Sequence, residues 1–172
     1  MRKYKNNKRT LINSLVMWLK KHKYSSLGML VCLSLGFLSG ILSGSAAEMD
    51  WYQGLRKPAI AVPKWLFAPV WTILYLMIGW VMGDIIAIWH KYKTLLAILL
   101  VNILLNLSWA PLFFHFHRID LAFYVILAMI ATLICFIFAN DKDYLWSLLL
   151  APYLLWIVFA ALLNFGIFYL NK

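Results

Sequence analysis

Charged residues are scarce in this sequence. Asp, Glu, Lys and Arg make up 13% of the 172 residues, and only six of them are acidic. Soluble domains carry about 25% charged residues, whereas 65% of this chain is hydrophobic. A soluble fold of this size has too little polar surface to cover so many apolar side chains. The composition therefore excludes an ordinary soluble domain and indicates an integral membrane protein.

The sequence also lacks the usual signatures of catalysis. Its two cysteines, Cys32 and Cys135, lie inside apolar runs without the spacing of metal ligands, so we interpret them as small packing residues. There is no Gly-rich phosphate loop, no cofactor fingerprint and no nucleophile with an adjacent base. These absences argue against hydrolysis and phosphoryl transfer. They leave radical chemistry on tryptophan open.

Five apolar runs are long enough to cross a membrane. A helix needs about 20 residues to span a hydrocarbon core of about 30 Å. The runs cover approximately 26–47, 65–89, 94–114, 119–139 and 144–170. Because the last three connections are only a few residues long, consecutive helices should be antiparallel neighbours. We therefore predict an all-α integral membrane protein, a five-transmembrane-helix bundle forming one domain over residues 26–172.

Positive charge is concentrated at the start of the chain. Half of the 16 Lys and Arg residues lie in the first 23 positions, around a short apolar stretch at 11–19. We interpret residues 1–25 as a basic tail or an interfacial helix that contacts anionic membrane lipid rather than nucleic acid. Eleven of the 16 cations fall on the tail's side of the five spans. The N-terminus is therefore expected in the cytoplasm and the C-terminus outside.

The first apolar run has a second interpretation. Residues 45–47, Ser-Ala-Ala, resemble the cleavage site of a secretory signal peptide. However, the segment before the run is unusually long, and Gly36, Gly40 and Gly44 place three small residues on one helix face, as in close helix contacts. A discarded peptide has no use for such a face. We therefore favour a retained transmembrane helix.

Aromatic and amide side chains follow one face of three predicted helices. Helical spacing groups Phe67, Trp71 and Tyr75; Asn102, Asn106 and Trp109; and Trp156, Ala160, Leu163 and Asn164. Three such faces could enclose a flat aromatic ligand, because Trp and Tyr supply rigid apolar area and a hydrogen-bond donor. Small Ala160 would leave room for that ligand. The alternatives are helix packing or an interfacial belt for the aromatic residues, and interhelical hydrogen bonds for the two asparagines of the third span.

Other residues also have two interpretations. Asp84 is the one carboxylate more than a turn from either end of a span, and we expect it to pair with Lys91 or Lys93 at the interface rather than to relay protons. His115 and His117 could ligate haem iron or another metal, but the sequence shows no third ligand, and solvated histidines are the simpler interpretation. Four tryptophans are assigned to the interfacial belt or to packing: Trp18, Trp80, Trp89 and Trp146.

Four pieces of the sequence occur in the order and spacing of one known family. They are W-Y-x-x-L-x-K-P at 51–58, P-x-W-x-F-x-P-V-W-T-x-L-Y at 63–75, L-N-x-x-W-x-P-x-F-F at 105–114 and P-Y-L-x-W-x-x-F-A-x-x-L-N at 152–164. Through them, the sequence over about 36–164 resembles the TspO/MBR family. That family comprises the tryptophan-rich sensory proteins and the mitochondrial translocator protein, also called the peripheral-type benzodiazepine receptor.

The resemblance implies a bundle of five helices, often homodimeric, with a cavity beneath the long first loop. Family members bind porphyrins such as protoporphyrin IX and haem, benzodiazepine-type ligands and, in some cases, sterols. No cofactor is required in this interpretation, because the porphyrin or haem is itself the ligand. Together with the three helical faces, the resemblance predicts these ligand contacts: Trp51, Tyr52, Phe67, Ala68, Trp71, Asn106, Trp109, Trp156, Ala160 and Leu163.

We therefore expect a multi-pass protein of a bacterial cell membrane that acts as a porphyrin receptor or sensor linked to tetrapyrrole regulation. The runner-up is an enzyme-like protein that photo-oxidatively degrades bound porphyrin, with Trp71 and Trp156 as redox-active neighbours. A transporter of tetrapyrroles or sterols is the third hypothesis.

The sequence departs from the family pattern at three positions. Val125 replaces an acidic residue that is common in the fourth span, and Ile60 replaces a frequent Trp. Phe165 replaces the Tyr of the family's sterol-contact segment, although Leu163, Tyr169 and Lys172 formally fit the short cholesterol pattern. A mechanism that needs the acid or the Trp does not carry over to this chain, and these residues weaken the case for sterol binding.

Overall fold

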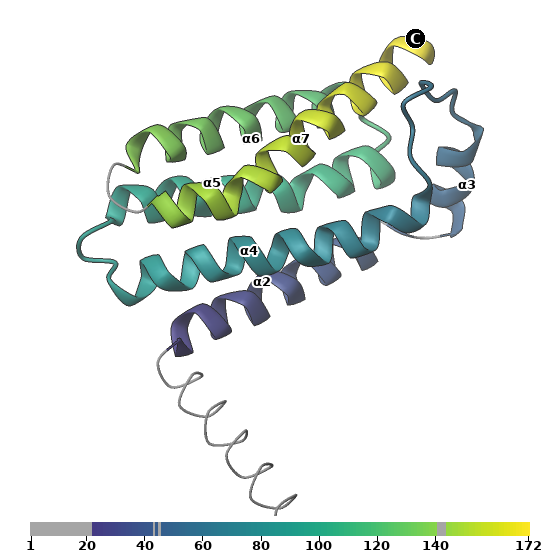
Figure 1. Cartoon of the computed structure of the whole chain (residues 1–172). Coiled ribbons are helices and arrows are strands. Elements are labelled where there is room, and N and C mark those ends of the chain that lie inside the picture. The colour runs from purple at the N-terminus through teal and green to yellow at the C-terminus, as the bar shows by residue number, and fades with distance from the viewer. Residues whose placement is uncertain (1–21, 43, 45, 141–143) are drawn as a thin grey trace, which may run out of the picture.

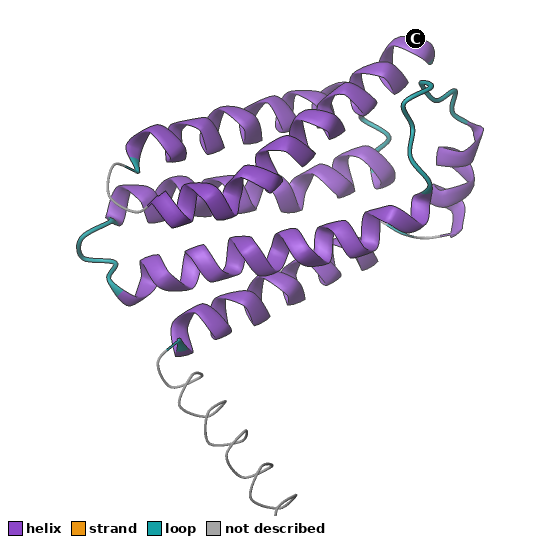
Figure 2. Ribbon diagram, viewed as in Figure 1, coloured by secondary structure: helices purple, strands orange, loops and turns teal. Residues whose placement is uncertain are grey.

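The computed structural model describes residues 22–42, 44, 46–140 and 144–172. These residues form helices and no strand (Figure 2). The elements are α2 (Lys23–Leu42), α3 (Ala46–Gly54), the 3₁₀ turn η1 (Lys64–Leu66), α4 (Phe67–Ala87), α5 (Lys93–Ala110), the π-helical turn η2 (Pro111–His115), α6 (Ile119–Ala139) and α7 (Tyr144–Leu170).

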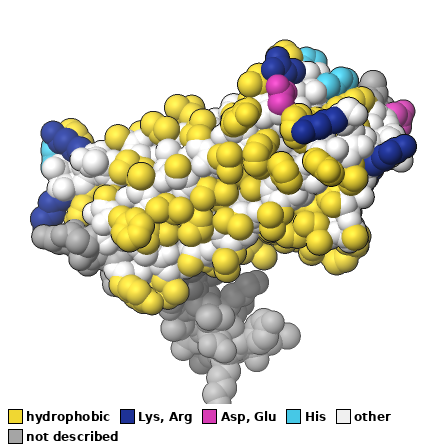
Figure 3. Space-filling view, turned by 90° about the horizontal axis from the view of Figure 1, so that it is seen from above, with side chains coloured by type: hydrophobic (Ala, Val, Ile, Leu, Met, Phe, Trp, Pro, Cys, Tyr) yellow, Lys and Arg dark blue, Asp and Glu magenta, His cyan; other side chains and the backbone are white. Residues whose placement is uncertain are grey.

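Five segments are long and apolar enough to cross a membrane: Lys23–Ile41, Lys64–Ala87, Lys93–His115, Ile119–Ala139 and Tyr144–Leu170. On the face shown in Figure 3, hydrophobic side chains cover the middle of the bundle, and the charged side chains gather towards its two ends. This distribution matches a hydrocarbon core with polar interfaces on either side. The protein is therefore an all-α, multi-pass integral membrane protein, as predicted.

The helices pack side by side in a bundle whose order around the ring is α2, α4, α7, α6 and α5 (Figure 1). The α2 helix packs mainly on α4 and makes fewer contacts with α5. Buried residues of α4, α5, α6 and α7 form the centre, including Ile78, Leu99, Leu133 and the fully buried Tyr153. At one end of the bundle α3 lies near the C-terminal end of α7 (Figure 1).

The boundaries of the last two spans agree with the prediction, whereas the first span differs. The α2 helix ends at Leu42 instead of near residue 47. A short helix, α3, starts at Ala46, at the end of the predicted first span, and continues into the segment between the first two spans. Ser39 and Gly40 near the end of α2 and Gly44 after it are weak helix formers, so the sequence favours an early end of the helix there. The α2 helix also begins at Lys23, within the predicted tail. The interfacial helix expected at 11–19, with Trp18, lies outside the described residues.

The close contact between α2 and α4 depends on glycines that the sequence analysis did not select. A Cβ atom on Gly79 would lie 2.5 Å from the Gly28 carbonyl oxygen, and one on Gly83 would lie 2.2 Å from the Tyr24 carbonyl oxygen. Of the predicted glycine face, Gly36 meets the Tyr75 ring, but a Cβ on Gly40 would have no neighbour within 4 Å. Close packing of backbones is therefore located nearer the start of α2 than predicted.

Asp84 does not pair with Lys91 or Lys93, so that prediction was wrong. The Ser25 hydroxyl and the indole N–H of Trp146 both donate hydrogen bonds to its carboxylate, the latter over 3.5 Å. Asp84 faces the neighbouring helices, and donors from α2 and α7 therefore reach it inside the bundle. The carboxylate links α2, α4 and α7 at the end opposite α3.

Trp146 has one of the two environments expected for it, whereas Cys135 differs from its expected environment. Trp146 is only 3% exposed, so it is a packing residue and not part of an interfacial belt. Cys32 is buried as expected, but Cys135 is exposed on α6 and is not a packing residue. An exposed cysteine on a spanning helix faces lipid, where a small weakly polar thiol is tolerated. Trp89 is exposed and lies beneath the Lys93 ammonium group, as suits an interfacial position.

Candidate ligand-binding cavity

A cavity of about 750 Å³ lies at the end of the bundle that carries α3. This volume is within the range of about 300–1,000 Å³ that is typical of small-molecule sites. Its walls come from α2, α4, α5, η2 and α7, with Tyr52 of α3 and Lys64 of η1. The site thus lies in the half of the bundle away from the Asp84 cluster.

The three helical faces predicted from the sequence converge on this cavity. Eight of the ten predicted contacts line it: Tyr52, Phe67, Ala68, Trp71, Asn106, Trp109, Ala160 and Leu163. Trp71 packs against Tyr75 and Tyr153, with ring centroids 5.4 Å and 6.3 Å away. The wall is therefore rigid, aromatic and mostly apolar, with an amide at Asn106. That these eight residues bind a ligand stays a prediction.

The two asparagines of α5 have different environments. Asn102 is buried, and its amide donates to the Met129 carbonyl (2.9 Å) and the Thr132 hydroxyl (2.8 Å) of α6. Asn106 accepts a hydrogen bond from the Tyr75 hydroxyl (2.7 Å) and donates to the Tyr153 hydroxyl (3.1 Å). Asn102 is thus an interhelical packing residue. Asn106 both joins helices and borders the cavity.

Tyr153 completes this network at the centre of the bundle. Its hydroxyl donates to Oδ1 of Asn102 over 2.9 Å while accepting from Asn106. The chain of hydrogen bonds runs from Tyr75 on α4 through α5 to Tyr153 on α7. Every member has a partner, so the polar groups are satisfied inside an apolar bundle, where an unpaired group is costly.

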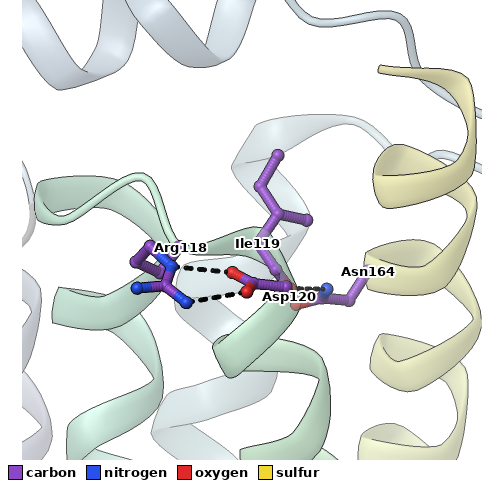
Figure 4. A network of polar contacts seen from close by, with 4 residues as sticks. All are labelled: Arg118, Ile119, Asp120 and Asn164. Carbon is purple, nitrogen blue, oxygen red and sulfur yellow. Dashed lines mark hydrogen bonds and ion pairs between the residues drawn. The ribbon is translucent and has the colours of Figure 1, made fainter. Parts of the chain in front are cut away.

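A second polar link holds α5, α6 and α7 together beside the cavity. The Trp109 indole N–H donates to Oδ1 of Asn164 (3.2 Å), and the Asn164 amide donates to the Ile119 carbonyl (2.9 Å). Figure 4 shows this last bond next to the paired Arg118 and Asp120, which are joined at 2.8–2.9 Å. The hydrogen bond to Asp120 raises the pKa of Arg118. Asn164 is thus held by the start of α6 and in turn orients the Trp109 ring.

Trp156 lies outside the main cavity. It borders a second hollow of about 20 Å³, and its ring meets Phe67 edge to face at 5.7 Å. Its indole N–H is buried and has no hydrogen-bond partner among the described residues. The hollow also touches Trp71, Asn106 and Trp109, so Trp156 lies behind the aromatic wall that the ligand would meet.

Trp51, the other predicted contact outside the cavity, holds α3 in place. Its ring stacks on His117 with centroids 4.0 Å apart and an angle of 19°, and it meets Phe113 edge to face. Tyr52 packs against Phe113 and Phe114 and lines the cavity, and burial raises the pKa of Tyr52. The α3 helix is thus docked on η2 by aromatic rings.

His117 therefore packs against α3, in a left-handed backbone conformation with φ of 54°. His115 contacts the neighbouring ring of Phe116. In the part of the chain that the structure describes, no group of three or more His, Cys, Asp or Glu side chains is arranged to hold a metal ion.

The C-terminal end of α7 fixes the loop after α3, which the sequence analysis did not foresee. Asn171 accepts a hydrogen bond from the Arg56 backbone N–H (3.0 Å) and donates one to the Arg56 carbonyl (2.9 Å). A Cβ on Gly166 would lie 2.8 Å from Pro58, so the loop packs closely on this glycine. Asn171 directly follows the last span and Gly166 lies near its end, and nothing in the sequence distinguishes the two from the residues of an ordinary helix end.

Several cavity residues were also missed. Gly36, Gly40 and Gly44 line the cavity although the sequence suggested only helix contact for them. Lys64 and Ile167 line it as well. Lys64 carries the only charge between Pro63 and Asp84 in the sequence, and that isolated charge was a signal that pointed to a special position.

Comparison with known proteins identifies the family. Residues 28–170 match the model of the TspO/MBR family. A tryptophan-rich protein TspO of Archaeoglobus fulgidus is 35% identical over 151 residues, covering 83% of this chain and 93% of that protein. Protein CrtK of Rhodobacter capsulatus is 32% identical, covering 81% of this chain and 88% of CrtK. The human translocator protein is 29% identical and covers 81% of this chain.

The matched region includes the last four spans, the first span from residue 28 onwards, α3 and every described residue that lines the cavity. The motifs at 51–58, 63–75, 105–114 and 152–164 all fall within it. The chain belongs to the TspO/MBR family.

Proposed function

We propose that this protein is a membrane receptor or sensor that binds a porphyrin-type tetrapyrrole in the cavity beneath α3. The observation that carries the proposal is the convergence of Phe67, Trp71 and Trp109 around one cavity of about 750 Å³. Flat aromatic ligands suit such walls, because stacked or edge-to-face rings gain about 0.5–1.5 kcal/mol beyond area burial. Relatives that carry the names tryptophan-rich sensory protein and translocator protein are compatible with a ligand-binding role in a membrane.

The direct test uses purified protein in detergent. Protoporphyrin IX is titrated in the dark while tryptophan fluorescence and the porphyrin spectrum are followed. Saturable quenching with no new absorbing species is the expected result for a receptor. No quenching at any porphyrin concentration below its solubility limit would contradict the proposal.

Light-dependent degradation of the porphyrin is the second candidate. It is favoured by the aromatic contacts of Trp71, whose ring lies beside Tyr75 and Tyr153 and so offers neighbours for an oxidised indole. The same titration repeated in light with dioxygen as the oxidant separates the two functions. Loss of the porphyrin band with a new product that requires Trp71 would support degradation. A transporter would instead show porphyrin movement across a vesicle membrane.

The remaining expectations belong to this proposal as well. We place the protein in a bacterial cell membrane with its N-terminus in the cytoplasm, and we expect a homodimer. Sterol is a weaker candidate ligand, because Phe165 replaces the family Tyr and is exposed on α7, away from the cavity lining. No bound cofactor is needed for a receptor, since the porphyrin or haem is the ligand.

A further inference from the structure

We infer that Lys57 and Lys64 form a carboxylate-recognition site at the mouth of the cavity and thereby set the orientation of the bound ligand. This inference rests on the proposed function and specifies the ligand further, as an apolar disc that carries carboxylates on one edge. That edge would face α3 and the first loop. The apolar edge would lie against Trp71 and Trp109.

The first step of the argument is the position of the two ammonium groups. Lys64 lines the cavity, and its Nζ lies 5.5 Å from the centroid of the Tyr52 ring. Nζ of Lys57 lies 4.7 Å from the same centroid. Since Tyr52 also lines the cavity, both positive charges lie beside the Tyr52 ring, at the end of the cavity that is near the first loop.

The second step is the hydrogen-bonding state of Lys57. Its ammonium group donates to the backbone carbonyls of Gln53 (3.2 Å) and Leu55 (3.0 Å). Those acceptors are neutral, so they orient the side chain without cancelling its charge. An ammonium group has three donors, and the third is available to a ligand carboxylate.

The third step is the contrast with the rest of the cavity. Among the described residues that line it, Lys64 is the one charged side chain, and the deeper wall is aromatic and aliphatic. The α4 helix also begins at the mouth and has no acidic residue in its first turn, so its N-terminal dipole adds to the positive potential there. Charge at one end and apolar surface at the other match an amphipathic ligand.

Protoporphyrin IX has this form, since both of its carboxylates lie on one edge of an otherwise apolar ring. Its dimethyl ester has the same ring without the charges. Comparing the two therefore isolates the contribution of the carboxylates. Each lysine near the surface should contribute about two- to fivefold in affinity, as measured for partly exposed ion pairs.

The experiment measures dissociation constants of both porphyrins for purified full-length protein in a neutral detergent. Variants are Lys57→Gln, Lys64→Gln, the double variant and the charge-preserving Lys57→Arg and Lys64→Arg. Lys93→Gln is the matched control, because Lys93 also lies over an aromatic ring, Trp89, but at the opposite end of the bundle. Binding of the ester reports whether each variant still folds with an intact cavity.

The wild-type protein should prefer the acid over the ester by about tenfold, and the double Gln variant should bind both equally. The Arg variants and Lys93→Gln should keep the preference, and added salt should reduce it. Equal binding of acid and ester by the wild type would overturn the carboxylate site while leaving porphyrin binding intact. Equal weakening of acid and ester in the Gln variants would show that the lysines only support the loop. If neither porphyrin binds the wild type, both this inference and the proposed function fail.

Discussion

Among single residues, Trp71 is the one on which ligand binding should depend most directly. It lines the cavity and packs against the rings of Tyr75 and Tyr153. We predict that Trp71→Ala weakens protoporphyrin IX binding about tenfold or more, because a large stacked surface is lost. Porphyrin absorbance titration measures this effect without relying on the removed indole.

Trp89→Ala is the control for that prediction. Trp89 is exposed at the other end of α4, and its replacement should leave affinity unchanged. Trp146 is unsuitable as a control, because it is buried and donates to Asp84. Equal losses in both variants, or no loss in either, would place the ligand elsewhere.

Tyr153 should matter for stability rather than for ligand contact. Its hydroxyl joins Asn102 and Asn106 at the centre of the bundle and is fully buried. We predict that Tyr153→Phe lowers the unfolding free energy by about 0.6 kcal/mol and by no more than about 1.7 kcal/mol, the average and the maximum for hydrogen bonds between membrane helices. Thermal unfolding in detergent tests this. Tyr169→Phe, at a residue that is 65% exposed on the same helix, should be neutral, and equal effects of the two changes would count against the network.

At the scale of elements, α2 has two surfaces with different roles, and a glycine is critical at each. Near its start it packs backbone to backbone on Gly79 and Gly83 of α4, whereas Gly40 borders the cavity. We predict that Gly83→Leu separates α2 from α4 and destabilises the protein, because its Cβ would overlap the backbone of Tyr24 and Ser25.

Gly40→Leu is the matched change on the other surface. It should leave the melting temperature nearly unchanged, because its Cβ has open space around it, and it should weaken porphyrin binding by filling the cavity. Thermal unfolding and porphyrin titration of both variants test the pair. Loss of stability in Gly40→Leu, or an unaffected Gly83→Leu, would contradict this division of α2.

The α3 helix should control ligand release. It is docked by the stack of Trp51 on His117 and by the edge contact with Phe113. We predict that Trp51→Ala increases the porphyrin dissociation rate several-fold, with a smaller effect on the association rate, since the residue does not line the cavity. Stopped-flow displacement measures both rates. An unchanged dissociation rate would mean that α3 does not cover the bound ligand.

For the whole molecule, the charge distribution predicts a single orientation in the membrane. In a variant lacking Cys32 and Cys135, a cysteine introduced at Ile60 should react only from outside, and one introduced at Lys91 only from the cytoplasm. Ile60 is an exposed loop residue and Lys91 lies in the turn between α4 and α5, at opposite ends of the bundle. The reverse labelling pattern would invert the orientation without changing the five spans.

The five spans could be predicted from the sequence, because membrane insertion depends on local hydrophobicity over about 20 residues. The family could be predicted from the order and spacing of the four motifs along the chain. Helical spacing also predicted which faces of α4, α5 and α7 carry the aromatic and amide side chains. Periodicity within one helix determines such a face. The family resemblance, added to this spacing, assigned Trp71, Asn106 and Trp109 to the site, and all three line the cavity.

Only the tertiary structure decided which neighbours each face meets. The helical spacing that groups Trp156 with Ala160 does not show that Phe67 lies in front of the indole. Likewise, three glycines at four-residue spacing look alike in sequence, yet Gly36 meets a ring and Gly40 meets open space. Asp84 was expected to pair with lysines close in sequence, but Ser25 and Trp146, about 60 residues away in the chain, donate hydrogen bonds to it instead. Packing between helices depends on residues that are distant in the chain, and the sequence pattern within one helix does not show which of them will be its neighbours.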